Sequence, residues 1–372
     1  MFPESKSAGQ KDNTSNIKQS KQMKTSFMDE IWSNLRQYWG TLLWTVKALA
    51  LVIFMTYIAV PIFIRANPWI VPKVIFSNVV RWPPFIDLSR PADFGLNTTR
   101  NLYLTVDNGV QLGSWHILPK SLEHRIDPLD PYVYEDLLAA GNKIMVYLHG
   151  NSGTRGGWHR VQMYKLLASL DFHVVTIDYR GFGDSSGSPS EDGVVSDAYF
   201  LYKWVRERSG SSPVFLWGHS LGTAITTKLA KKLCHEGEPP LGVVLEAPFN
   251  NIREAAENHP FSFPYRLLPW FSWIFIDTIK ENGIFFNSDE NIEHVTPPIL
   301  ILHAEDDAIV PLHLGKKLYH AAKESRQDHH GDVEFQVFDG DDGFGHKHIF
   351  KSPNLPGIIQ NFVDKSIGKK KN

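Results

Sequence analysis

The order of apolar and polar positions predicts a domain of alternating strands and helices from about residue 100 onward. Short apolar runs recur there, and helical stretches separate most of them from the third run onward. Strands spaced by helices form βαβ units with a mostly parallel sheet, and the first two runs predict an antiparallel pair. We therefore expect an α/β domain over residues 100–368, with an eight-stranded sheet flanked by helices. The eight runs are NLYLTV, QLGSWHILP, KIMVYLHG, FHVVTIDYRG, PVFLWGHS, GVVLEAP, PPILILHAEDD and VEFQVFDG.

An insertion over residues 250–295 interrupts this alternation and is rich in aromatic residues. Its most aromatic part, residues 260–273, reads PFSFPYRLLPWFSW. Such side chains belong either to a buried core or to a lid over an apolar substrate. We expect a lid-like insertion and keep the core interpretation beside it.

An apolar segment nearer the N-terminus has the length of a membrane span. Residues 48–64 carry no charge, and the segment extends back past Lys47 to Thr41. The helix from Thr41 to Ile64 would be about 36 Å long, enough to cross a hydrocarbon core of about 30 Å with some tilt. A cleaved signal peptide is the alternative, but the segment begins far from Met1 and no small-x-small cleavage site follows it. We expect a single transmembrane helix over residues 41–65.

The segments flanking this helix differ in character. Residues 1–40 are mostly polar, and we expect them to form a disordered tail. Their lysines place this tail on the cytosolic side under the positive-inside rule. Residues 66–99 are expected to form a juxtamembrane segment at the interface, a depth that suits Trp69.

Two short signals bear on orientation and disagree. Asn97-Thr98-Thr99 is an N-glycosylation sequon, which predicts a glycan on Asn97 and a lumenal domain. The lysines at 369–371 resemble a dilysine retrieval signal, which is read in the cytosol, and we interpret them as a solvated tail.

Composition excludes several classes of function. With 38 Lys and Arg against 40 Asp and Glu, the chain lacks the basic excess of a nucleic-acid binder. Its single cysteine, Cys234, excludes a disulfide framework and a cysteine-rich zinc site. Because Walker, G-x-G-x-x-G and H-E-x-x-H motifs are also missing, we expect neither a cofactor nor a metal.

Ser220 is the candidate nucleophile, in the G-x-S-x-G motif Gly218–Gly222. A short apolar strand precedes this motif and a good helix follows it. The sharp strand-to-helix turn crowds its neighbours, which explains the need for glycine two residues on either side. The same turn exposes the serine Oγ beside the free N–H groups of a helix N-terminus.

A serine needs a base, and the base needs an orienting carboxylate. In chain order the acid comes next, and Asp307 follows the seventh apolar run, with Asp306 as the alternative. The base should follow the eighth run, where the glycine-rich loop brings His346 over the serine and His348 is the competitor. Ser220, Asp307 and His346 in this order predict the α/β-hydrolase fold.

An oxyanion hole belongs after the third run, at His149-Gly150-Asn151. We expect the backbone N–H groups of Asn151 and Leu221 to hold the negative oxygen of the tetrahedral intermediate. His149 and the Arg180–Ser185 loop are interpreted as scaffold.

Four motifs together resemble the α/β-hydrolase domain-containing protein 12 family of lysophosphatidylserine lipases. The motifs are H-G-N-S-G-T-R-G-G-W-H-R, D-Y-R-G-F-G-D-S, W-G-H-S-L-G and L-H-A-E-D-D. Their joint occurrence is far more specific than G-x-S-x-G alone, and the resemblance covers nearly the whole chain apart from the polar tail.

This resemblance implies a single-pass lipase of the endoplasmic reticulum membrane, with its catalytic domain in the lumen and a role in phosphatidylserine catabolism. It implies hydrolysis of the acyl ester of lysophosphatidylserine and of monoacylglycerols, with oxidised phosphatidylserine as a further candidate. The family's catalytic residues correspond to Ser220, Asp307 and His346.

Other functions stay open. An acyl-thioesterase acting on proteins or lipids would use the same triad, and a close paralogue of the lipase shares the same motifs. A catalytically dead interaction protein is the alternative of another class, although the nucleophile, acid and base are all present here in order.

Overall fold

The computed structural model describes residues 11–80, 86–106, 109–125 and 133–370. The chain divides into two compact units, residues 1–63 and residues 64–372. Each unit is described by itself below.

The N-terminal unit is helical. Helix α1 runs over Lys11–Phe54, and it continues as a π-helical turn, η1 (Met55–Ala59), and then as α2 (Val60–Ala66). The stretch Asn16–Ala66 is long and apolar enough to cross a membrane by length and composition.

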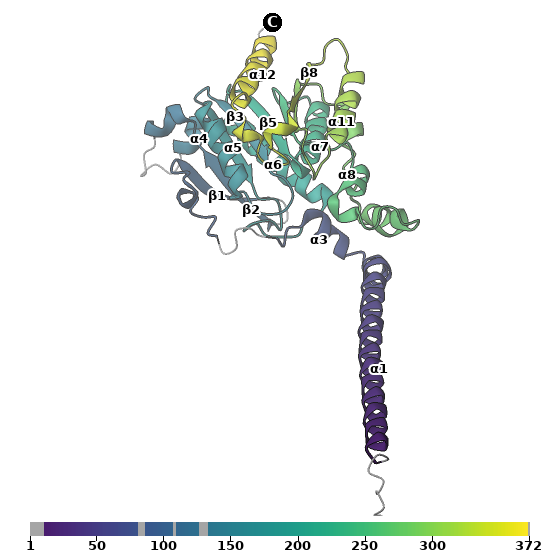
Figure 1. The fold of residues 1–372 in the computed structure, drawn as a ribbon. Coiled ribbons are helices and arrows are strands. Elements are labelled where there is room, and N and C mark those ends of the chain that lie inside the picture. The colour runs from purple at the N-terminus through teal and green to yellow at the C-terminus, as the bar shows by residue number, and fades with distance from the viewer. Residues whose placement is uncertain (1–10, 81–85, 107–108, 126–132, 371–372) are drawn as a thin grey trace, which may run out of the picture. The chain divides into compact units, whose positions relative to one another are not determined.

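The helix begins well before the expected span, since residues 11–40 are helical rather than disordered (Figure 1). Residues 1–10 of the expected tail lie outside the described residues. Residues 11–39 contain neither proline nor glycine. Once the apolar segment has formed its first turns, adding further residues without helix breakers costs little free energy.

The second unit contains the predicted sheet, with helices around it (Figure 1). The sheet has eight strands in the order β1-β2-β4-β3-β5-β6-β7-β8. Strand β2 pairs antiparallel with both β1 and β4, and all other neighbours are parallel. The bounds are β1 Thr99–Thr105, β2 Gln111–Ile117, β3 Lys143–Leu148, β4 Phe172–Ile177, β5 Val214–His219, β6 Val243–Glu246, β7 Ile299–Ala304 and β8 Val333–Phe338. The predicted α/β-hydrolase architecture is therefore confirmed.

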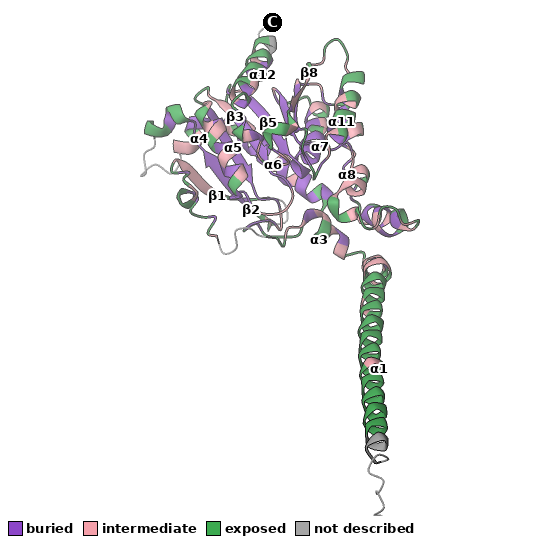
Figure 2. Ribbon diagram, viewed as in Figure 1, coloured by how far each residue is buried: buried purple, intermediate pink, exposed green. Residues whose placement is uncertain are grey.

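Helices pack on both faces of the sheet, which explains why strands β3–β7 are almost wholly apolar (Figure 2). The core on one face includes residues of α6 (Glu191–Arg208), α7 (Leu221–His235) and α11 (Leu312–Glu324). The core on the other face includes residues of α5 (Trp158–Ser169) and α12 (Leu355–Lys370). The short helix α4 runs over Val133–Leu138.

In such sheets, the loops that bind ligands or carry catalytic residues follow the carboxyl ends of the parallel strands.

The insertion is built from short helical pieces that join α8 (Ile252–Asn258) to β7. These are a 3₁₀ turn η5 (Pro260–Ser262), a π-helical turn η6 (Ser272–Ile276), α9 (Asp277–Glu281) and α10 (Ser288–Ile292). Its aromatic side chains divide between the interior and the surface. Phe271 and Phe286 are buried, whereas Phe261 and Phe263 are exposed, and the lid stays a prediction.

The juxtamembrane segment contains helix α3 (Ile70–Phe76). Val71 and Phe76 are buried, and Phe76 packs edge-on against Phe286 of the insertion with ring centroids 6.2 Å apart. This segment is therefore part of the second unit rather than a free linker.

Candidate active site

Ser220 lies at the tight turn between β5 and α7. Its φ of 52° and ψ of −118° are strained for a residue with a side chain, as a nucleophile elbow requires. A Cβ atom on Gly218 would lie 2.4 Å from the Gly222 carbonyl oxygen, and one on Gly222 would lie 2.0 Å from the Leu148 carbonyl oxygen. The two glycines of the motif are therefore needed because backbone passes too close for any side chain.

The structure brings the three predicted residues of the triad together. His346 Nε2 lies 2.9 Å from Ser220 Oγ, and His346 Nδ1 lies 2.7 Å from Asp307 Oδ2. Asp307 follows β7, and its Oδ1 accepts hydrogen bonds from the backbone N–H groups of Ile309 and Val310, each at 2.9 Å. These bonds fix the carboxylate so that its second oxygen faces the imidazole.

The two alternative residues have other partners. Asp306 accepts the backbone N–H of Gly345 with both oxygens at 2.9 Å, and so holds the loop that carries the histidine. His348 lies beside Trp158 and Phe350, with ring centroids 6.0 Å away in each case.

Two carboxyl groups, one in the triad and one beside it, have pKa values shifted in opposite directions. Burial by itself would raise the pKa of Asp307, but its hydrogen bond to His346 and the nearby histidine charge leave it below its ordinary value. Burial raises the pKa of Glu246 to about 8, although its hydrogen bond from Trp217 lowers it, and the charge of Asp307 adds to the rise. Asp307 is therefore the ionised acid and Glu246 a neutral one below that pH.

Glu246 also supports the elbow. Its carbonyl oxygen accepts the Ser220 N–H at 2.9 Å, and its side chain accepts the Trp217 indole N–H at 2.8 Å. The end of β6 thus holds the turn of the nucleophile.

The predicted oxyanion donors lie on segments that border Ser220. A Cβ atom on Gly150 would lie 3.1 Å from the Cβ of Ser220, so the loop after β3 passes directly against the serine. Leu221 is the first residue of α7, where backbone N–H groups have no partner within the helix.

One buried arginine holds the loop that contains Asn151. The Arg160 guanidinium donates to the carbonyl oxygens of Gly150 (2.9 Å), Asn151 (3.1 Å), Ser152 (2.7 Å) and Thr154 (2.6 Å). The Gly150 carbonyl and the Asn151 N–H belong to one trans peptide and point in opposite directions. By binding the carbonyl, Arg160 directs that N–H away from itself.

The juxtamembrane segment also holds the loop that contains Asn151. The Asn151 side chain donates to the Ile75 carbonyl oxygen at 2.6 Å, and the Gly153 N–H donates to the Val80 carbonyl oxygen at 2.8 Å. Asn78 donates to the carbonyl oxygen of Gly181 at 2.9 Å.

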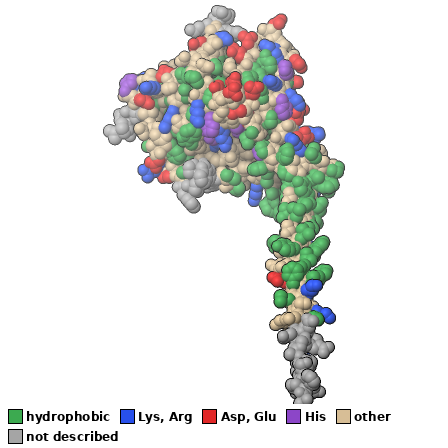
Figure 3. All heavy atoms as spheres, in the orientation of Figure 1, with side chains coloured by type: hydrophobic (Ala, Val, Ile, Leu, Met, Phe, Trp, Pro, Cys, Tyr) green, Lys and Arg blue, Asp and Glu red, His purple; other side chains and the backbone are tan. Residues whose placement is uncertain are grey.

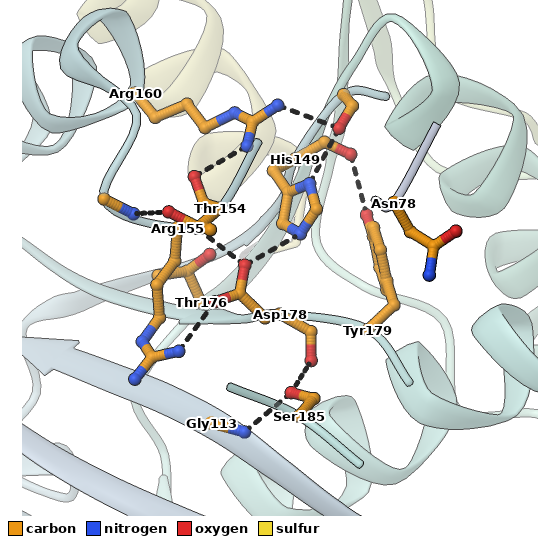
Figure 4. Close-up of polar contacts among 12 residues, drawn as sticks. Asn78, Gly113, His149, Thr154, Arg155, Arg160, Thr176, Asp178, Tyr179 and Ser185 are labelled. Atoms are coloured by element: carbon orange, nitrogen blue, oxygen red, sulfur yellow. Dashed lines mark hydrogen bonds and ion pairs between the residues drawn. The ribbon is translucent and has the colours of Figure 1, made fainter. Parts of the chain in front are cut away.

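His149 and the Arg180–Ser185 loop belong to a buried polar network centred on Asp178 (Figure 4). The Asp178 carboxylate accepts the N–H and guanidinium of Arg155, each at 2.6 Å, and lies 3.3 Å from His149 Nε2. Burial lowers the pKa of His149. Ser185 donates to the Asp178 carbonyl oxygen at 2.6 Å. These contacts join Asp178 to Arg155, His149 and Ser185 and not to Ser220, which fits a scaffold.

Sequence reasoning missed Arg160 and Glu246. The available signal for Arg160 was its place at the end of the glycine-rich H-G-N-S-G-T-R-G-G-W-H-R stretch, directly after a strand. Glu246 carried a signal as the one acid at the end of an otherwise apolar run.

Two further expectations concern other sites. Asn97 is exposed in a turn just before β1, so its side chain is accessible to modification. Among the described residues, no group of three or more His, Cys, Asp or Glu side chains could hold a metal ion.

Comparison with known proteins places this geometry in a family. The family model for the alpha/beta hydrolase fold matches residues 143–274. The chain is 49% identical over 324 residues to a zebrafish (Danio rerio) lysophosphatidylserine lipase ABHD12, covering 87% of this chain and 85% of that protein. The rat (Rattus norvegicus) lysophosphatidylserine lipase ABHD12 is 50% identical over 321 residues, covering 86% and 81%. Human protein ABHD12B is 41% identical over 296 residues, covering 80% and 81%.

Solved structures share the fold at low identity. An α/β hydrolase of Vibrio vulnificus superposes with a TM-score of 0.58 at 16% identity, covering 79% of this chain and 91% of that one. An esterase of Pyrococcus furiosus gives 0.55 at 18% identity, covering 77% and 97%. These structures show the fold alone, whereas the identity to the zebrafish and rat relatives shows that the chain belongs to the ABHD12 family of serine hydrolases with the α/β-hydrolase fold.

Proposed function

We propose that this enzyme is a membrane-bound lipase that hydrolyses the acyl ester of lysophosphatidylserine and of monoacylglycerols, with oxidised phosphatidylserine as a further substrate. The observation that carries the proposal is the hydrogen-bonded chain from Ser220 through His346 to Asp307. The substrate class is supported by about 50% identity to relatives named lysophosphatidylserine lipase, against 41% to ABHD12B.

In the first half of the reaction, Ser220 Oγ attacks the ester carbonyl carbon as its proton moves to His346 Nε2. Asp307 accepts the Nδ1 hydrogen bond and stabilises the imidazolium. The N–H groups of Asn151 and Leu221 hold the oxyanion. The carbon–oxygen bond to glycerol then breaks, and His346 gives its proton to the departing oxygen.

The second half releases the fatty acid. Water attacks the acyl-serine carbon and gives a proton to His346. The bond to Ser220 Oγ then breaks, and the proton returns to the serine. These steps balance with water as the co-reactant, and Ser220 and His346 return to their starting states.

The location belongs to the same proposal. The apolar stretch that ends at Ala66 crosses the endoplasmic reticulum membrane once. The second unit, residues 64–372, carries the triad, is called the catalytic unit from here on, and lies in the lumen. Exposed Asn97 carries the glycan expected there. The insertion over residues 250–295 acts as a lid on the acyl chain.

The test compares wild-type protein and Ser220→Ala in membranes, measuring fatty-acid release from lysophosphatidylserine, a monoacylglycerol and an acyl-thioester. Loss of the nucleophile should lower kcat by roughly 10⁴- to 10⁶-fold. Ser169→Ala, at the exposed end of α5, is the matched control and should leave the rate unchanged. Unchanged activity in Ser220→Ala would show that Ser220 is not the nucleophile. A preference for the thioester would show that the enzyme is a thioesterase rather than a lipase.

A further inference from the structure

Exposed apolar side chains gather on one part of the catalytic unit, over α3 and the insertion (Figure 3). Leu267 is 89% exposed, Phe261 80% and Val79 70%, values that are high for large apolar side chains. We call this set the apolar rim. It consists of Trp69, Val74, Val79, Val80, Phe261, Phe263, Leu267 and Trp273.

The two parts of the rim are tied together. Arg65 binds both carboxylate oxygens of Glu281 at 2.5 and 2.8 Å, and Asn282 donates to the Pro68 carbonyl oxygen at 3.0 Å. These bonds fix the start of the juxtamembrane segment on α9, directly after the aromatic part of the insertion. The rim is therefore one surface and not two independent loops.

Cations lie over three of its aromatic rings. Lys73 lies 4.8 Å from the Trp69 ring, Arg266 4.9 Å from Phe263 and Arg65 5.3 Å from Trp273. Neither Lys73 nor Arg266 forms an ion pair with another described residue. Aromatic and basic side chains mixed in this way match the headgroup level of a membrane with anionic lipids.

Chain length brings the rim close to such a surface. The stretch that could span a membrane ends at Ala66, and Trp69 follows three residues later. Three residues reach at most about 10 Å. We propose that the apolar rim is a second membrane contact of the catalytic unit, which rests on anionic lipid in addition to the transmembrane anchor.

This contact would also serve the active site. The segment that carries Val79 and Val80 holds the Asn151 loop through the Ile75 and Val80 carbonyl oxygens. Lipid bound at the rim therefore holds the segment that supports one wall of the site, and places the site beside its membrane-borne substrate. This last consequence rests on the proposed lipase activity, whereas the membrane contact rests only on the proposed membrane span that ends at Ala66.

The test uses the full chain with Cys234 replaced by serine, and single cysteines introduced as Val79→Cys, Leu267→Cys or Gln360→Cys. Each carries a fluorescent label after reconstitution into phosphatidylcholine vesicles with or without phosphatidylserine, and shallow spin-labelled lipids serve as quenchers. Gln360 is the control, being exposed on α12 and outside the rim. Labels at 79 and 267 should be quenched, more strongly with phosphatidylserine, and the label at 360 should not. Equal quenching at all three positions would overturn the proposal.

A second readout separates the contact from the chemistry. The double variant Trp69→Glu, Val74→Glu, on exposed rim positions outside the insertion, should raise KM for a vesicle-borne ester roughly tenfold, the effect of about 1.4 kcal/mol. Its kcat/KM for a soluble short-chain ester should stay unchanged. An unchanged KM on vesicles would count against the rim. Because quenching does not depend on turnover, failure of the lipase proposal alone would leave the quenching result intact.

Discussion

The two adjacent aspartates after β7 have separate tasks, which mutation can tell apart. Asp307 bonds the imidazole, so Asp307→Asn should lower kcat roughly 10⁴-fold by favouring the wrong histidine tautomer. Asp306 only anchors the Gly345 N–H, and an amide oxygen can still accept that bond. Asp306→Asn should therefore cost less than about tenfold in fatty-acid release. Equal losses in both variants would show that the acid has been assigned to the wrong residue.

Glu246 makes stability depend on pH in a defined direction. Its pKa rises from 4.5 to about 8 in the folded protein, chiefly because of burial. Below about pH 4.5 the Glu246 carboxyl is protonated in both the folded and the unfolded protein, so its full contribution to the free energy of unfolding is present. As pH rises toward 8, only the unfolded state loses the proton, so stability falls, by on the order of a few kcal/mol.

Glu246→Gln tests this dependence because an amide does not titrate but can still accept the Trp217 N–H. Thermal unfolding of the detergent-solubilised protein, followed from about pH 5 to about pH 8, should show a smaller decrease in Tm than for the wild type. The control is Glu334→Gln, at an exposed pair with Lys365. A decrease equal to that of the wild type would show that Glu246 is ionised throughout this range.

Among single residues, those that could be predicted from the sequence belong to local motifs or follow a fixed chain order. Ser220 could be placed because two glycines two residues away report a crowded turn, and the acid and base follow in a fixed order. Arg160 and Glu246 stood out by position alone. Their roles could not be predicted, because their partners are backbone carbonyls and an indole that only the packing of the sheet brings close.

At the scale of elements, the loop after β3 depends on α5 for its shape. Arg160→Met would leave four carbonyl groups without their donor and release the peptide that carries the Asn151 N–H. We expect kcat to fall roughly 10²- to 10³-fold, the cost of losing one oxyanion donor, with a smaller change in KM. Arg160→Lys should restore part of the rate, since an ammonium can still donate to some of these oxygens.

A matched control separates this effect from the loss of a charge. Arg253→Met removes an exposed arginine that pairs with Glu257 on α8, and should leave kcat unchanged. If Arg160→Met raised KM and spared kcat, Arg160 would contribute to substrate binding rather than to the oxyanion loop.

Elements themselves were predictable to different degrees. The strands could be read from apolar runs because sheets covered on both faces need apolar side chains on both sides. The part of helix α1 before residue 41 could not be predicted, because its polar composition is equally typical of a solvated tail. Its helical form depends on the apolar helix that follows.

For the whole molecule, the remaining question of orientation can be answered by two sequons. Asn13-Thr14-Ser15 precedes the apolar stretch and Asn97-Thr98-Thr99 follows it. A chain that crosses the membrane once exposes only one of them to the lumen, so the glycosylated asparagine reports the side of the catalytic unit.

We expect the glycan on Asn97, which is exposed in a turn ahead of β1. Glycosidase treatment of the protein made in cells should increase its mobility, and Asn97→Gln, but not Asn13→Gln, should abolish that shift. A shift that depends on Asn13 would instead place the catalytic unit in the cytosol, where the lysines at 369–371 could be read as a retrieval signal and lysophosphatidylserine would have to be met on the opposite leaflet.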